Sequence, residues 1–264
     1  EDFPKVLPIL ALKNTVLFPG IIIPITVGRD RSIEAINTAY GADRKVAVLS
    51  QKDSEVEEPE ADDLYEVGTV ARILKLLRMP DGTTTAILQG RNRFHLEVML
   101  QEKPFMKGEI SPIHYIDPKN TLEFEALIAS VLDLATQIIE LSPNIPSEAM
   151  VMLKNISSHS FLLNFIASNL SAKVHIKQKI LETSDLTEKA NLLLMQLNDE
   201  LQLLELKDQI ENKVRVDIEK QQRDYFLNQQ LKTIQEELGQ NPQEQEIKNL
   251  IERAHKKKWS KEVN

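Results

Sequence analysis

Apolar residues alternate with polar ones in several short stretches of the first 118 residues. In the clearest of these, apolar side chains stand at positions 94, 96, 98 and 100, with Arg93, His95 and Glu97 between them. A period of two is typical of a strand with one buried face, so we expect the first set to point to the core. Similar runs predict further strands at residues 6–12, 21–27, 45–49, 65–79 and 83–89.

Local sequence features predict two of the connections between these strands. Pro80, Asp81 and Gly82 separate two of the runs and predict a hairpin turn, because Pro fixes φ and Gly accepts a positive φ. Between the second and third runs, apolar residues recur at helical spacing behind Asp30 or Ser32, either of which is a candidate N-cap. Short strands with one inserted helix indicate a small barrel or folded sheet.

The distribution of glycine and proline predicts where the chain becomes helical. Seven of the eight glycines lie between Gly20 and Gly108, and eleven of the twelve prolines lie at or before Pro146. Both residues interrupt helices, so we expect a β-rich domain at 1–118, a helical subdomain at 119–185 and a long helix with a linker at 186–264. The helical spacing predicts helices at 122–141, 147–156, 161–170 and 174–181.

A long helix is predicted by the stretch from Leu186 to Leu238, which contains neither Gly nor Pro. Ser184 or Asp185 is placed to cap its start, and Gly239 to cap its end. Its second half carries an apolar stripe that needs a partner surface, either another subunit or domain or its own bundle. The candidate interface residues of this stripe are Tyr225, Leu231, Ile234 and Leu238.

Composition and charge narrow the possible functions. The formal net charge of −8 disfavours binding to phosphate backbones and to anionic membranes, and no apolar run is long enough to span a bilayer. The absence of cysteine excludes disulfides and thiolate chemistry. Residues 51–66 are strongly acidic, but their spacing does not match a calcium loop, so we interpret them as a solvated loop.

The sequence contains no recognisable catalytic motif. It lacks the GxxxxGK[ST] phosphate loop, the GxSxG elbow and the HExxH zinc pair. The run from Ser157 to Ser160 contains His159, but sequence neighbours rarely form a catalytic triad, and an interhelical turn is the better interpretation. We therefore predict a non-enzymatic chain without metal or cofactor that neither hydrolyses ATP nor cleaves casein.

Two groups of motifs resemble the N-terminal part of Lon proteases. Residues 6–20 (VLPILALKNTVLFPG), with the following run at 24–32 (PITVGRDRS), are similar to the opening of the family's first domain, with Lys13 where Arg is usual. Residues 64–71 and 88–93 resemble later motifs of that domain. Residues 222–239 (QRDYFLNQQLKTIQEELG) are similar to a helix of the same family, with Asp224 in place of Glu. The first domain also occurs in cereblon-like adaptors, from which this helix distinguishes Lon.

This resemblance implies an α+β chain, with a PUA-like β pseudo-barrel followed by an α-helical bundle and a long, partly coiled-coil helix. It implies a homohexameric, ATP-dependent serine protease whose Ser–Lys dyad and ATP and Mg²⁺ sites lie outside these residues. The expected role is substrate recognition and assembly, with unfolded or damaged proteins as partners and no membrane or nucleic acid. The expected location is the bacterial cytoplasm, or the mitochondrial matrix if a transit peptide was removed.

The candidate substrate contacts lie near the Pro19–Gly20 turn. Phe18 and Ile21 are the apolar candidates, with Arg31 and Glu34 as a charged rim. The alternative is that the apolar residues of this segment fill the barrel core. Two other functions stay open at this point: an RNA-binding module, which a gel shift at low salt would detect, and a purely structural spacer, which would not crosslink to unfolded protein.

Overall fold

The computed structural model describes residues 3–79, 83–142, 145, 148–238 and 242–256. By compactness the chain divides between Glu205 and Leu206, and the two units are described separately. The strands are β1 (Val6–Leu12), β2 (Ile22–Val27), β3 (Lys45–Ser50), β4 (Val67–Arg78), β5 (Thr84–Gln101) and β6 (Lys107–Ile113). The helices are α1 (Asp30–Gly41), the short 3₁₀ turn η1 (Ala61–Asp63), α2 (Thr121–Leu141), α3 (Glu148–Lys154), α4 (His159–Asn169), α5 (Val174–Glu182), α6 (Leu186–Glu237) and α7 (Pro242–Lys256).

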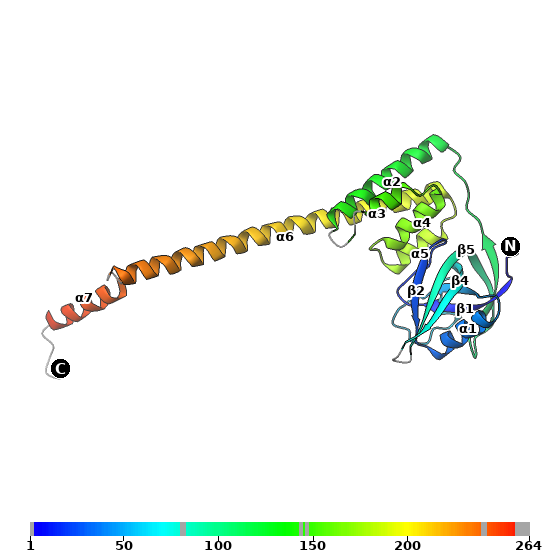
Figure 1. The fold of residues 1–264 in the computed structure, drawn as a ribbon, viewed down its shortest axis with the longest axis horizontal. Coiled ribbons are helices and arrows are strands. Elements are labelled where there is room, and N and C mark those ends of the chain that lie inside the picture. The colour runs from blue at the N-terminus through cyan, green and yellow to red at the C-terminus, as the bar shows by residue number, and fades with distance from the viewer. Residues whose placement is uncertain (1–2, 80–82, 143–144, 146–147, 239–241, 257–264) are drawn as a thin grey trace. The chain divides into compact units, whose positions relative to one another are not determined.

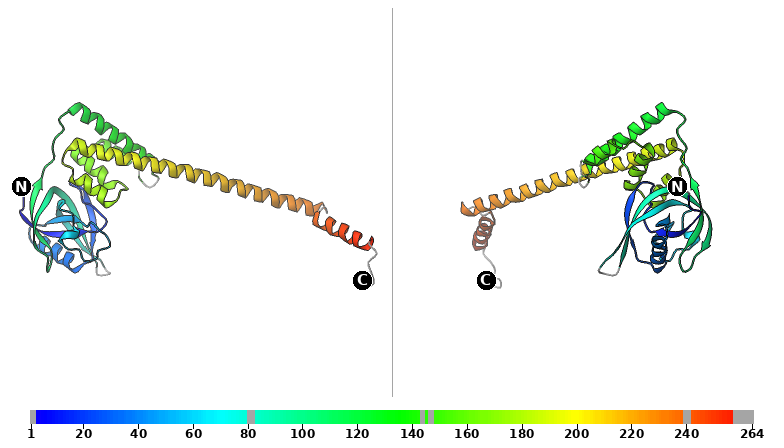
Figure 2. Two further views of the ribbon diagram at one scale, coloured as in Figure 1. Left: turned by 180° about the vertical axis from the view of Figure 1, so that it is seen from behind. Right: turned by 45° about the vertical axis from the view of Figure 1, so that its right-hand side comes forward.

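The six strands form one sheet that closes on itself. The strand order is β2-β5-β4-β3-β1-β6, and an additional pairing of β5 with β6 joins the two sides. The first half of β5 pairs with β2 on one side and with β4 on the other, and its second half, from Arg93 to Gln101, pairs with β6. The sheet curls into a barrel, with α1 at one end and helices α4 and α5 at the other (Figures 1 and 2). This arrangement confirms the predicted barrel followed by helices.

Strand β5 corrects the expected alternation. The runs at 83–89 and 93–100 are one continuous strand, and Phe94 is buried as predicted. Val98 and Leu100, however, are exposed, whereas Met99 packs against the core. A register shift between Leu96 and Val98 explains the reversal, because one extra residue turns every following side chain to the other face.

The N-cap of helix α1 comes before both of the residues predicted for that position, Asp30 and Ser32. Arg29 has extended backbone geometry and occupies the N-cap position, without a side-chain cap. Asp30 is therefore the first helical residue, where its negative charge interacts favourably with the helix dipole. The prediction that Asp30 or Ser32 caps the helix was wrong. Ala35, Ile36 and Ala39 form its buried face.

The later helices follow the predicted spacing, and polar side chains cap three of them. Asn120 caps α2 and Ser158 caps α4. Asp185 caps α6, because its Oδ1 accepts hydrogen bonds from the backbone N–H groups of Thr187 and Glu188 at 2.8 and 3.0 Å. Helix α6 runs for 52 residues, which confirms the single long helix. The Pro80–Gly82 turn, the start of the helix predicted at 147 and the Gly239 cap lie outside the described residues.

Three apolar clusters stabilise the first unit. Alternate residues of β1 divide between two of them: Leu10 and Leu12 join the cluster that contains α1 residues, and Leu7 and Ile9 join the cluster around Phe94. The third cluster holds the helices together and also includes Val16 and Phe18, from the segment between β1 and β2. That segment therefore connects the strands to the helical subdomain.

Candidate functional site

The structure contradicts one predicted substrate contact. Phe18 has 0% of its surface exposed and packs in the helical cluster, so it cannot touch a substrate while the domain is folded. The prediction was wrong because the Phe18–Gly20 turn faces α4 instead of solvent. Ile21 is partly buried and packs against both neighbouring clusters. The exposed apolar residue of this segment is Ile22, at 54%.

The charged candidates lie on α1. Arg31 Nε forms an ion pair with Glu58 Oε2 of the acidic loop at 3.3 Å, and Glu34 is exposed. Phe18 and these two residues belong to different parts of the domain, because Phe18 packs among the helices and α1 packs against the barrel cluster. The structure therefore does not combine the four candidates into one surface. A substrate contact by Ile21, Arg31 or Glu34 stays a prediction.

A buried polar network replaces the expected surface at the Phe18 turn. Asn164 Oδ1 accepts hydrogen bonds from Tyr115 Oη at 3.0 Å and from Lys189 Nζ at 2.5 Å. Asn164 Nδ2 donates to the carbonyl of Pro19 at 3.3 Å. The Lys189 ammonium also lies 5.6 Å from the centre of the Phe18 ring. These contacts connect the turn, α4 and the first turns of α6.

Arg93 of β5 adds further hydrogen bonds between the barrel and the helices. Its guanidinium donates to the carbonyls of Leu181 and Thr183, at the end of α5, and to that of His114. The group also lies 4.0 Å from the centre of the Tyr115 ring. Free carbonyls at a helix end carry partial negative charge, so a buried cation is stabilised there without a carboxylate.

Burial shifts the pKa values of these groups. Desolvation, and then the charge of Arg93, hold the pKa of Lys189 well below its ordinary value. Desolvation lowers the pKa of Arg93 as well, and it raises the pKa of Tyr115 despite the nearby guanidinium. Lys189 is fully buried and faces polar and aromatic groups of the protein, so the network positions the two parts of the domain.

An apolar groove in the helical subdomain is the best candidate for ligand contact. It has a volume of about 400 Å³. Helices α2, α3, α4 and α6 contribute its walls, with polar residues at Ser142, Asn169 and Glu200. Its apolar lining residues are Ala135, Ile138, Ile139, Ile145, Ala149, Leu153, Phe165, Ile166, Leu170, Leu197 and Leu204. Met152 of α3, three residues after Ala149, is 61% exposed and extends the apolar surface.

The second unit contains the rest of α6 and α7. Tyr225, Leu231, Ile234 and Leu238 are all exposed, as expected for a stripe without a partner in this chain. Earlier on the same helix, Ile210, Val214 and Ile218 line a shallow apolar hollow. The exposure of these residues is observed, and their role in assembly stays a prediction.

Candidate metal ligands do not come together in the part of the chain that the structure describes. Within it, no group of three His, Asp or Glu side chains could hold a metal ion, and no helix is long and apolar enough to cross a membrane. Ser158 caps α4, and the His159 ring packs edge-on against Phe124. Ser157 and Ser158 lie between α3 and α4, as the interhelical turn predicted for 157–160 requires, whereas His159 and Ser160 already belong to α4.

Comparison with known proteins agrees with the fold. Residues 6–199 match the profile of the ATP-dependent protease La (LON) substrate-binding domain. The chain is 50% identical over its full length to Lon protease of Flavobacterium johnsoniae and 46% identical to that of Cytophaga hutchinsonii, and it spans 32% of each. The N-terminal domain of Mycobacterium avium complex Lon protease superposes with a TM-score of 0.62 over 74% of this chain and 99% of that domain, at 22% identity.

Proposed function

Because this chain belongs to the Lon substrate-binding domain family, we propose that it recruits unfolded or damaged protein chains to an ATP-dependent serine protease. The chain spans about a third of the length of its curated relatives, so the peptidase dyad and the sites for ATP and Mg²⁺ would lie elsewhere in the full-length protein. The substrates would be misfolded, damaged and short-lived regulatory proteins. The protein would act as a homohexamer in the bacterial cytoplasm, or in the mitochondrial matrix.

The apolar groove between α2, α3, α4 and α6 is the observation that carries this proposal. Unfolded chains share exposed apolar side chains, and a binding domain must offer a matching surface that is small enough to keep it soluble. The groove combines apolar walls with a polar rim, as sites for flexible ligands do. Met152 adds an adaptable side chain beside it, which suits varied sequences.

Two neighbouring leucines on α6 provide a matched test. Leu204 lines the groove, whereas Leu203 is 67% exposed and does not. We expect Leu204→Glu to weaken binding of a reduced, alkylated unfolded protein by about tenfold, because a charge would enter an apolar contact surface. Leu203→Glu should leave the affinity within about twofold of the original, since a residue outside the contact contributes little. Fluorescence anisotropy of the labelled unfolded protein measures both.

A second variant separates lost contact from lost folding. Ala149→Trp fills the groove without adding charge, and it should reduce binding while the melting temperature stays close to that of the unmodified chain. Equal affinities for Leu203→Glu and Leu204→Glu would assign substrate contact to another surface. Absence of binding by the unmodified chain would favour a structural spacer.

A further inference from the structure

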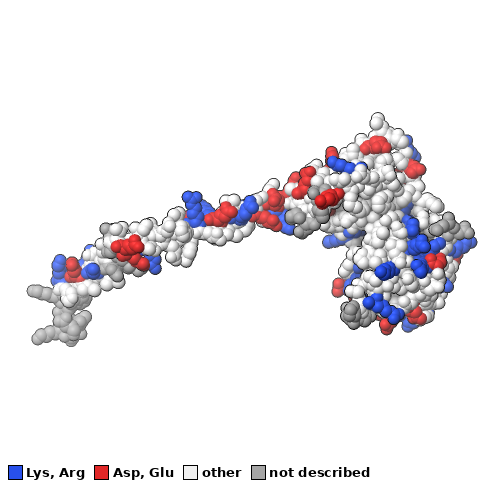
Figure 3. All heavy atoms as spheres, in the orientation of Figure 1, with Lys and Arg blue, Asp and Glu red and all other residues white. Residues whose placement is uncertain are grey.

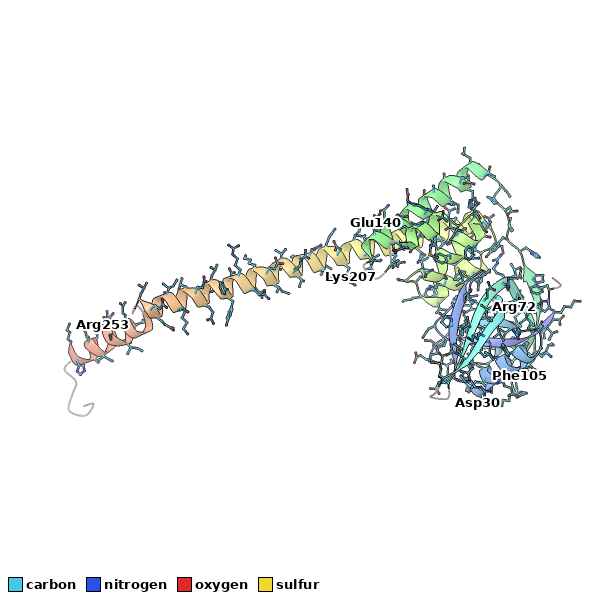
Figure 4. All side chains as sticks on the ribbon, in the orientation of Figure 1. Asp30, Arg72, Phe105, Glu140, Lys207 and Arg253 are labelled. Carbon is cyan, nitrogen blue, oxygen red and sulfur yellow. The ribbon has the colours of Figure 1, made fainter. Side chains whose placement is uncertain are left out.

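A second pocket lies on the barrel, away from the apolar groove, and its lining is rich in cations. It has a volume of about 550 Å³. Lys45 of β3, Arg72 of β4 and Arg91 of β5 contribute to it, together with His114 after β6. Lys and Arg side chains gather on this face of the barrel, and Arg72 can be located there (Figures 3 and 4). Among the lining residues that the structure describes, the acidic one is Asp43, and its side chain accepts a hydrogen bond from the backbone N–H of Lys45.

Two of these cations face each other across neighbouring strands. Lys45 and Arg72 are direct partners in the antiparallel pairing of β3 with β4. Like charges in this position destabilise a sheet. Among the described residues, no ion pair within 4 Å involves Lys45, Arg72 or Arg91. An anion between Lys45 and Arg72 would remove their repulsion.

A β-bulge in β5 brings the third cation, Arg91, into the pocket. Ala71 pairs with Gly90 and Thr69 pairs with Arg93, so Arg91 and Asn92 together stand opposite the single residue Val70. Arg91 and Asn92 are both exposed, against the usual alternation, and both line the pocket. Bulges often redirect side chains at binding sites. Here the bulge places a guanidinium and an amide beside Arg72.

The remaining lining is apolar. Phe3, Pro112 and Ile113 surround the cations, and Val70 and Ala71 form a buried base. An apolar base lowers the local dielectric constant, so ion pairs formed above it are stronger than on an open surface. Two guanidinium groups can each bind a carboxylate through paired hydrogen bonds.

We propose that this pocket binds an acidic stretch of polypeptide through its side-chain carboxylates. The inference extends the proposed recruitment of protein chains, but its site and its chemistry are separate from those of the apolar groove. Charge complementarity supports a short acidic ligand. A nucleic acid would need a long basic track, whereas this chain carries a net charge of −8 and an acidic loop at 51–66 on the same domain.

The test uses a fluorescent peptide of alternating Asp, Glu, Gly and Ser, and its neutral counterpart with Asn and Gln. We expect the acidic peptide to bind with an affinity that falls as salt rises, and the neutral one not to bind. Arg72→Gln with Arg91→Gln should weaken binding by about tenfold. The matched control is Lys75→Gln with Arg78→Gln, which removes the same charge from exposed positions of β4 outside the pocket. We expect this control to change the affinity by less than about twofold.

Several results would overturn the proposal. These are absence of acidic-peptide binding, equal affinity for the neutral peptide, or equal loss in both double variants. Binding of an oligothymidine that depends on Arg72 and Arg91, without peptide binding, would assign the pocket to nucleic acid instead. The Leu204→Glu variant should bind the acidic peptide normally, so a failure of the groove proposal is distinguishable from a failure of this one.

Discussion

Lys189 of α6 donates a hydrogen bond to Asn164 of α4 in a site where both side chains are buried. Asn164 in turn donates to the carbonyl of Pro19, in the segment between β1 and β2. A buried ammonium is costly unless it is hydrogen-bonded, and it is far less costly when it releases its proton. The helices are attached to the barrel through this contact. We therefore expect the stability of the attachment to depend on whether Lys189 carries its proton.

The pH dependence of stability should report this lysine. Its pKa is lowered in the folded state, so between that value and its ordinary pKa of 10.5 the unfolded chain binds more protons. In that window the free energy of unfolding must rise with pH, by up to about 1.4 kcal/mol per pH unit for one proton. Lys189→Met removes this contribution. We expect a flatter dependence for the variant in urea unfolding measured from neutral pH to pH values near 10.

An exposed lysine of the same helix is the control. Lys213→Met should keep the pH dependence of the unmodified chain, because that side chain is exposed in both states. Lys189→Met also leaves Asn164 Oδ1 with one hydrogen bond fewer, which costs about 1–3 kcal/mol at every pH. The informative quantity is therefore the slope. Identical slopes for all three proteins would show that Lys189 keeps its proton.

Phe18 and Ile22 should respond very differently to truncation. Phe18→Ala removes a fully buried ring and should lower the free energy of unfolding by about 3–5 kcal/mol. Ile22→Ala removes a largely exposed side chain and should change it by about 0.5 kcal/mol or less. Chemical denaturation measures both. Equal effects would contradict the placement of Phe18 in the helical cluster.

The sequence predicts the elements well where a local signal decides them. The stretch from Leu186 to Leu238 without Gly or Pro predicts one helix, and Asp185 caps it as expected. Local signals fail where a distant segment decides. Arg93 follows the polar phase of its strand, yet it is buried because carbonyls of α5 approach it. The burial of Lys189 does have a local signal, because Leu186, Ala190 and Leu193 share its face of the helix by their spacing and are themselves buried.

Neither candidate binding site follows from one segment. The groove draws on four helices, and the basic pocket depends on the register of β3, β4 and β5. Register and helix packing are set by contacts between segments, so a single sequence does not reveal them. The wrong prediction that Phe18 contacts substrate has the same cause. An apolar side chain is compatible with burial in the core and with binding, and the sequence alone does not distinguish the two.

The second half of α6 should be cleaved early by proteases. All but one of the described side chains from Leu206 to Leu238 are exposed, and local unfolding there breaks few tertiary contacts. We expect the first cuts between Ile218 and Lys248, before any cut at 70–100. Mass spectrometry of a time course identifies the sites. Early cleavage within the barrel would show that its strands open more readily than the helix.

Gly20 should not tolerate a side chain, for two separable reasons. Its φ is +84°, which L-residues rarely adopt, and an added Cβ would lie 2.5 Å from the Phe161 ring of α4. Gly20→Ala should therefore destabilise the domain by about 1–3 kcal/mol, whereas Gly28→Ala, which has open space around it, should have little effect.

A double-mutant cycle separates the two causes. Phe161→Ala makes room beside Gly20, so Gly20→Ala should destabilise the Phe161→Ala background less than it destabilises the unmodified chain. The loss that remains measures the backbone strain alone, since the ring is absent from both members of that comparison. Urea unfolding of the four proteins gives the coupling free energy. A coupling of zero would show that the turn does not pack against α4 in solution, and the attachment of the helices through Phe18 and Pro19 would then need another explanation.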